Sequence, residues 1–125
     1  MNIVTTIARV LLGLIFVVFG LNFWFNFIAM PQPPAGSPPA LFFGAIYPTG
    51  FLAVVKAIEV LGGLLLLSGR FTSLGLTLVG PVVVNIVLFD LFLTKSFNPL
   101  GAAVAVFSLL VLYGKRENFA GLLKA

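Results

Sequence analysis

Four long apolar segments, separated by short polar or proline-rich stretches, dominate the pattern along this chain. They cover about residues 3–27, 48–67, 72–93 and 100–113. A membrane-spanning helix needs about 20 consecutive and mostly apolar residues, and the first three segments reach that length. Short connections between successive helices make neighbours antiparallel. The pattern therefore predicts an all-α fold, in which residues 1–125 form one domain, an antiparallel four-helix transmembrane bundle.

The connection between the first two segments predicts a short additional helix. Proline is abundant in the loop Met30–Pro39, so the first span cannot continue through it. Ser37 followed by Pro38 is typical of a helix N-cap and of the first helical position. The apolar residues 41–47 are therefore expected to form a short interfacial helix at the membrane surface.

Composition supports a membrane protein and excludes several kinds of chemistry. The chain is 61% hydrophobic and only 8% charged, whereas soluble domains carry about 25% charged residues. It has no cysteine and no histidine, which excludes thiol–disulfide chemistry by this chain, thiolate-bound clusters and histidine-ligated haem. We expect no metal site and no covalent cofactor. The net charge of +4 is not a nucleic-acid signal, because Lys and Arg mainly set orientation in membrane proteins.

The basic residues predict how the chain crosses the membrane. Cytoplasmic loops carry an excess of Lys and Arg. One side of the bundle would hold the N-terminal amine together with Arg9, Arg70, Lys115, Arg116 and Lys124, whereas the other side would hold only Lys95. Both termini are therefore expected in the cytoplasm, and the proline-rich loop outside.

Two charges lie one helical turn apart inside the second apolar segment, at Lys56 and Glu59. A charge near the bilayer centre costs about 2.5–3.5 kcal/mol on insertion scales, so such residues usually face a bundle interior or a wet cavity. Two interpretations remain open. The two side chains form a local ion pair that neutralises itself for insertion, or they take part in ligand binding or proton movement.

Other polar residues are expected at similar or shallower depths. A rise of about 1.5 Å per residue places Glu59 near the midplane, Asn85 close to it, and Asn22 and Asp90 further out. The simplest arrangement that satisfies them is a polar pocket that opens outward under the Phe42–Phe43 segment. Asn22 and Asn85 also fit plain hydrogen bonds between helices. Asp90 lies off the Asn85 face, where it would cap a helix or line the rim.

Arg9 is the polar residue of the opposite, inner half of the bundle. It fits a snorkelling anchor at the cytoplasmic surface. It also fits an interior partner for Glu59, because an arginine side chain can just bridge the difference in depth between the two residues. The sequence leaves both interpretations open.

Three segments resemble the DoxX family of small bacterial membrane proteins. They are Arg9-x3-Gly13-x2-Phe16-x3-Gly20, the Glu-x-x-Gly-Gly motif that opens 59–70, and the third-span segment 80–89. The resemblance covers nearly the whole chain and implies a four-helix bundle in the bacterial cytoplasmic membrane. Some relatives belong to thiosulfate:quinone oxidoreductases, and others are associated with thiol redox and oxidative-stress complexes. Asp90 stands where one subgroup has histidine in a Phe-His-Leu-Phe pattern.

These observations favour an accessory or binding subunit with an outward-facing pocket for a quinone or isoprenoid-type lipid. Two alternatives stay open: a component of a quinone-linked oxidoreductase, and a small transporter or structural subunit. No catalytic residue is identified, and the chain is not expected to be an enzyme on its own. Expected partners are the bilayer, a membrane redox partner or a second copy, but no nucleic acid. The candidate pocket residues are Glu59, Lys56, Asn85, Asn22, Arg9 and Asp90.

The orientation can be tested with a reporter fused after Ala125. We expect a reporter that is active only in the cytoplasm to give a signal, because most basic residues belong to that side. A periplasmic signal from the same fusion would contradict the predicted orientation.

Overall fold

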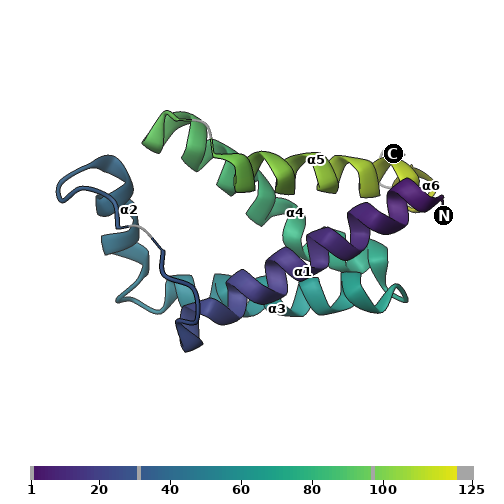
Figure 1. Ribbon diagram of the computed structural model, residues 1–125, viewed down its shortest axis with the longest axis horizontal. Coiled ribbons are helices and arrows are strands. Elements are labelled where there is room, and N and C mark those ends of the chain that lie inside the picture. The colour runs from purple at the N-terminus through teal and green to yellow at the C-terminus, as the bar shows by residue number, and fades with distance from the viewer. Residues whose placement is uncertain (1, 31, 97, 121–125) are drawn as a thin grey trace.

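The computed structural model describes residues 2–30, 32–96 and 98–120, and all regular elements in these ranges are helices (Figure 1). The long helices are α1 (Ile3–Phe25), α3 (Phe51–Ser68), α4 (Thr72–Leu88) with its π-helical continuation η1 (Phe89–Thr94), and α5 (Pro99–Gly114). Two short helices, α2 (Pro38–Ile46) and α6 (Arg116–Phe119), complete the described chain. Successive long helices run in opposite directions (Figure 1). The predicted all-α bundle is confirmed.

Glycines and a proline set the helix boundaries. Helix α3 begins at Phe51, a few residues later than expected, because Gly50 has a left-handed φ of 86° that a continuous helix cannot accommodate. Gly69, with φ of 73°, ends the same helix. Helix α5 begins with Pro99, directly after Asn98, whose side chain accepts a hydrogen bond from the Leu100 N–H at 3.1 Å. Local backbone chemistry therefore fixes where each span starts and stops.

Helix α2 closes one end of the bundle. The Ser37 side chain accepts a hydrogen bond from the Ala40 N–H at 3.4 Å, which confirms the predicted N-cap. Phe42 and Phe43 project from α2 onto Phe89 of η1, with ring centroids 5.5 and 5.2 Å apart. These aromatic contacts tie the short helix to the far end of α4. Within the proline-rich loop, Pro31 lies outside the described residues.

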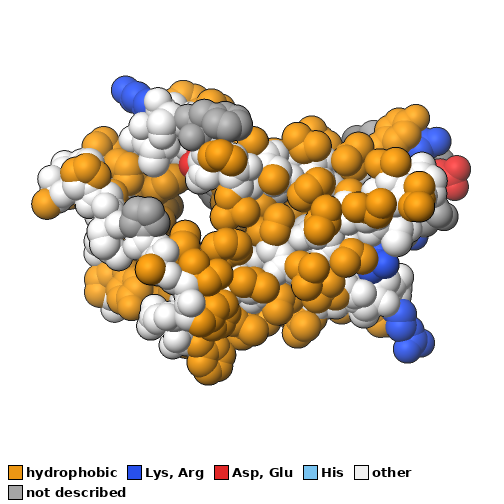
Figure 2. Space-filling view, in the orientation of Figure 1, with side chains coloured by type: hydrophobic (Ala, Val, Ile, Leu, Met, Phe, Trp, Pro, Cys, Tyr) orange, Lys and Arg blue, Asp and Glu red, His pale blue; other side chains and the backbone are white. Residues whose placement is uncertain are grey.

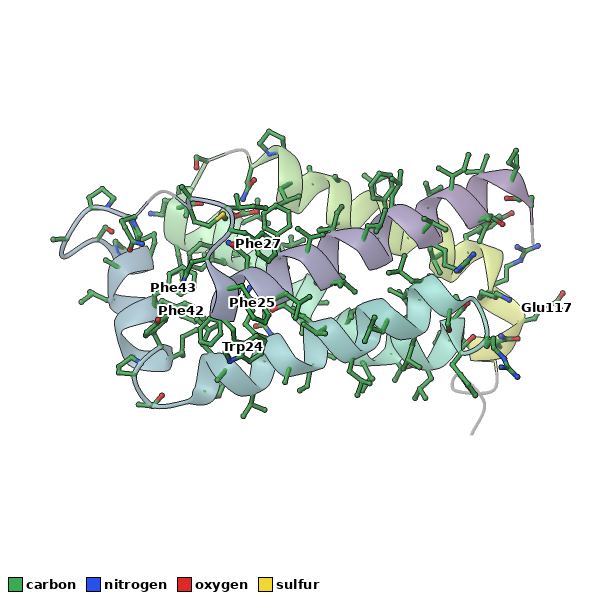
Figure 3. The ribbon with its side chains drawn as sticks, turned by 60° about the horizontal axis from the view of Figure 1, so that its bottom comes forward. Trp24, Phe25, Phe27, Phe42, Phe43 and Glu117 are labelled. Atoms are coloured by element: carbon green, nitrogen blue, oxygen red, sulfur yellow. The ribbon has the colours of Figure 1, made fainter. Side chains whose placement is uncertain are left out.

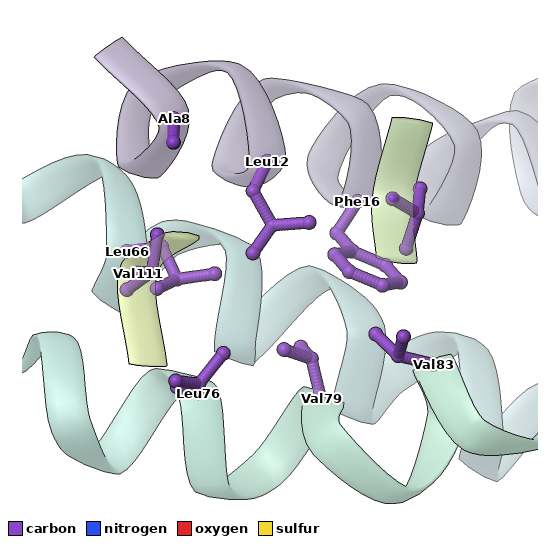
Figure 4. Close-up of a cluster of buried hydrophobic side chains, with 9 residues drawn as sticks. Ala8, Leu12, Phe16, Leu66, Leu76, Val79, Val83 and Val111 are labelled. Atoms are coloured by element: carbon purple, nitrogen blue, oxygen red, sulfur yellow. The ribbon is translucent and has the colours of Figure 1, made fainter. Parts of the chain in front are cut away.

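The core is a single cluster of apolar side chains from all four long helices (Figure 4). Water does not drive helices together inside a bilayer, so the bundle depends on close van der Waals packing. The most deeply buried residues are 2% exposed or less, and they are Ala8, Leu12, Phe16, Leu66, Val79, Val104 and Val111.

Glycines bring α1 and α3 into backbone contact. A Cβ atom added to Gly63 would lie 2.9 Å from the Gly13 carbonyl oxygen and 3.0 Å from the Val17 backbone nitrogen. One added to Gly20 would lie 2.7 Å from a Val60 methyl group. These contacts fix the register between the two antiparallel helices.

The outside of the bundle is apolar along its length. Helices α1, α3 and α4 with η1 are long and apolar enough to cross a membrane, and α5 is a shorter apolar helix. Hydrophobic side chains cover most of the surface in Figure 2, and basic side chains gather at the end where both termini lie. Lys124, which was expected at this end, lies outside the described residues. The chain is a membrane protein whose helical surface faces lipid.

The α1–α3 contact predicts a large difference between two glycine substitutions. We expect Gly63→Ala to lower the free energy of unfolding by about 1–3 kcal/mol, the usual cost of overpacking, because two of the three atoms nearest to the added carbon are backbone atoms of α1 that cannot move aside. Gly80→Ala is the matched control, since no atom lies within 4 Å of the added carbon. Unfolding in mixed micelles measures both, and equal losses would contradict the predicted role of the contact.

Candidate functional site

Lys56 and Glu59 form an ion pair inside the bundle. The Lys56 Nζ atom lies 3.4 Å from Oε2 of Glu59 and 3.5 Å from Oε1. The Glu59 side chain is only 7% exposed, whereas that of Lys56 is 23% exposed. No other group in the described ranges bonds to this carboxylate. Of the two basic partners considered for Glu59, the structure therefore pairs it with Lys56.

Helix packing places Glu59 in the interior of the bundle. It shares one stripe of α3 with Leu52 and Leu66, both buried. On one side of this position Val60 meets Gly20 of α1, and on the other side Gly62 meets Val79 of α4. A carboxylate can accept about four hydrogen bonds, and one ammonium group cannot supply them all. Glu59 thus retains acceptor capacity in an otherwise apolar region.

Arg9 is positioned by the end of α3 and does not reach Glu59. Its guanidinium donates to the Leu66 carbonyl and, at 3.1 Å, to the Leu67 carbonyl. The last carbonyls of a helix have no partner within the helix, so they are strong acceptors for a nearby cation. Of the two interpretations that the sequence left open for Arg9, the pairing with Glu59 is therefore not observed, because these free carbonyls bind the guanidinium instead. Arg9 clamps the start of α1 to the end of α3.

Asn22 bonds within its own segment rather than between helices. Its side chain accepts from the Ile28 N–H at 2.8 Å and donates to the Ile28 carbonyl at 3.0 Å. The buried amide therefore folds the chain back where α1 ends, next to the left-handed Asn26. The predicted interhelical bond was wrong, because the exit loop already satisfies the amide.

Asn85 does not join the pair either. Its side chain is exposed and donates to the Pro81 carbonyl of the same helix at 3.0 Å. The prediction of an interhelical bond within the described chain was again wrong, because Asn85 points away from the buried face of α4, which carries Val79 and Val83.

Asp90 lies at the start of η1, half-buried, with its carboxylate against Gly101 in the first turn of α5. There is no room for a side chain at that glycine. The first N–H groups of a helix favour a negative charge, so this position suits a carboxylate. Asp90 therefore packs η1 against the start of α5, where Asn98 is the N-cap. Whether Asp90 lines the rim of a pocket, the other alternative, stays a prediction.

Aromatic side chains surround the end of the bundle nearest the pair. Figure 3 places Trp24, Phe25, Phe27, Phe42 and Phe43 together there. They come from the end of α1, from the segment that follows it, and from α2. Figure 2 shows a hollow between the α2 end and the rest of the bundle, with hydrophobic side chains on the bundle side of it.

Sequence reasoning missed the contribution of α1 to this aromatic end. Phe23 of α1 packs on Tyr47, which follows α2, with ring centroids 5.4 Å apart. Phe23 also meets Trp24 edge-on at 5.0 Å. The shared aromatic character of the two segments is the signal that could have linked them. At the opposite end, one open pocket is lined by residues 114–118 and another by residues 69–74 with Lys115 and Asn118, and neither contains Lys56 or Glu59.

A double-mutant cycle measures how strongly the pair is coupled. We expect Lys56→Met to lower the free energy of unfolding by about 3 kcal/mol, because it leaves a buried charge without its partner. We expect Lys56→Met combined with Glu59→Gln to recover most of that loss, since no buried charge then remains. Unfolding in mixed micelles measures the four proteins. Losses that simply add would show that the two side chains are independent.

A comparison with known protein families agrees with the helical membrane fold described above. The DoxX family model matches residues 4–114, which is most of the chain and includes all four long helices. No curated protein and no solved structure matches the chain. The resemblance seen in the sequence motifs is confirmed, and this membrane protein belongs to the DoxX family.

Proposed function

We propose that this protein is an accessory or binding subunit of the bacterial cytoplasmic membrane, and that it holds a quinone or isoprenoid-type lipid at its aromatic end. The observation that carries the proposal is the buried Glu59 carboxylate, whose one described partner is the partly exposed Lys56. Ligand sites for small apolar molecules are mostly hydrophobic, with a few well-placed polar groups. The aromatic end and the ion pair together have this composition.

The pair offers complementary hydrogen-bonding groups to such a ligand. A lysine ammonium has three donor hydrogens, and a carboxylate only accepts. Lys56 would donate to a carbonyl oxygen of a quinone, and Glu59 would accept from a hydroxyl of the reduced quinol. The aromatic rings suit the ligand's flat head group, and the surrounding lipid suits its chain.

Any redox chemistry would belong to the ligand or to a partner's cofactor. The chain contributes no cysteine and no histidine, and the protein's part would be to bind and orient the redox-active molecule. This assignment agrees with a subunit that works beside a membrane redox partner.

We further propose that the aromatic end faces the outside of the cell. Both termini lie at the other end (Figure 1), and Arg70, Lys115 and Arg116 belong to that end as well. Lys95 follows η1 at the aromatic end. This asymmetry supports a cytoplasmic location for the termini, so the ligand would enter from the outer leaflet.

The single tryptophan provides a direct binding assay. Trp24 is the only tryptophan in the chain and belongs to the aromatic end. A short-chain benzoquinone, titrated into the protein in lipid nanodiscs, is expected to quench its fluorescence saturably. We expect Lys56→Met to weaken this binding by about tenfold, the scale of one lost charge-assisted hydrogen bond.

Lys95→Met is the control, because Lys95 is exposed and lies beyond the pair at the end of η1. It should leave the dissociation constant unchanged. The double variant of Lys56→Met and Glu59→Gln separates binding from folding, since it is expected to be stable but unable to bind. Wild-type affinity in that variant, or quenching without saturation in the wild-type protein, would refute the proposal.

A further inference from the structure

Asn85 presents a polar amide to the lipid near the middle of the membrane. The apolar span formed by α4 and η1 runs over Thr72–Thr94, and Asn85 lies about 3 Å from its centre at a rise of about 1.5 Å per residue. The side chain donates one hydrogen to the Pro81 carbonyl. Among the described residues, its second amide hydrogen and its Oδ1 atom have no partner. The second amide hydrogen and Oδ1 are therefore available to bond to a group outside the bundle.

The backbone beside Asn85 adds a further free acceptor. Pro81 has no N–H, so the Thr77 carbonyl lacks the hydrogen bond it would otherwise accept within the helix. Thr77, Pro81, Asn85 and Leu88 are all exposed, and we call this surface the α4 outer face. Hydrocarbon cannot satisfy a donor or an acceptor, so a covering surface must supply both.

Several polar groups inside this bundle have partners within the chain, although the buried Arg9 Nε, Thr72 Oγ1 and Ser108 Oγ atoms have none among the described residues. Glu59 pairs with Lys56, Arg9 bonds to the end of α3, and Asn22 bonds to Ile28. The Asn85 amide differs because most of its hydrogen-bonding capacity is left on the exposed surface, at the depth where water is scarcest. This difference indicates that the partner of the Asn85 amide lies in another molecule and not elsewhere in the same chain.

We propose that a second copy of this chain covers the α4 outer face, as a parallel two-fold dimer in which the Asn85 amides bond to each other. A primary amide carries both a donor and an acceptor, so it is complementary to its own copy. A two-fold axis places a residue opposite itself. Two copies inserted with the same orientation have this axis along the membrane normal, which lets α4 pack against α4 along its length. Polar side chains bond helices together in this way within bilayers.

The absence of cysteine from the chain makes a crosslinking test unambiguous. Leu88→Cys introduces one thiol on the α4 outer face, where Leu88 is 44% exposed. Leu109→Cys is the control, because Leu109 is 65% exposed but lies on α5. After oxidation in native membranes, we expect a disulfide-linked dimer from Leu88→Cys and monomer from Leu109→Cys.

A second substitution tests the amide itself. Adding Asn85→Leu to Leu88→Cys is expected to reduce the crosslinked fraction roughly fivefold, the scale of one interhelical hydrogen bond. Adding Asn85→Gln keeps both hydrogen-bonding functions and is expected to retain most of the crosslink. Equal crosslinking through Leu109→Cys, or an undiminished crosslink with Asn85→Leu, would overturn the proposal. Asn85→Leu should leave quinone quenching of Trp24 unchanged. The proposed dimer and the proposed ligand site can therefore be refuted independently of each other.

Discussion

The close approach of the α1 and α3 backbones is the contact on which the other features depend. Because lipid tails are as apolar as the helices, only tight packing holds the two helices together, and Gly13, Gly20 and Gly63 make that packing possible. Their contacts fix the register of α3 against α1. The same register turns Glu59 into the bundle and brings Arg9 to the last carbonyls of α3. A shift of one turn would separate Arg9 from these carbonyls.

The treatment of charge follows from this register. Lys56 and Glu59 neutralise each other within one helix, so the pair costs less in the membrane than two separate charges. Arg9 takes up carbonyls that would otherwise lack partners at a helix end. Asp90 similarly lies against the first turn of α5. The charged groups in the bundle thus either bond to each other or lie at helix ends, next to an apolar core cluster.

The sequence could predict features that depend on neighbouring residues. The lengths of the apolar segments predicted the spans, and the Ser37–Pro38 pair predicted the start of α2. The i,i+3 spacing predicted the Lys56–Glu59 ion pair as one of two interpretations. It could not predict the partners of Arg9 and Asn22, because these are backbone groups whose positions depend on how the chain packs and turns. The π-helical η1 also left no signal, since its residues are as apolar as the preceding α-helix.

The unequal lengths of the helices affect the surrounding bilayer. Helix α5 has 16 residues and α1 has 23, which correspond to about 24 and 35 Å at 1.5 Å per residue. The hydrocarbon core of a bilayer is about 30 Å thick. The hydrophobic length of α5 is therefore shorter than the hydrocarbon core, whereas that of α1 is long enough to span it. Hydrophobic mismatch of this kind thins the bilayer on one flank of the protein and draws shorter-chain lipids to it.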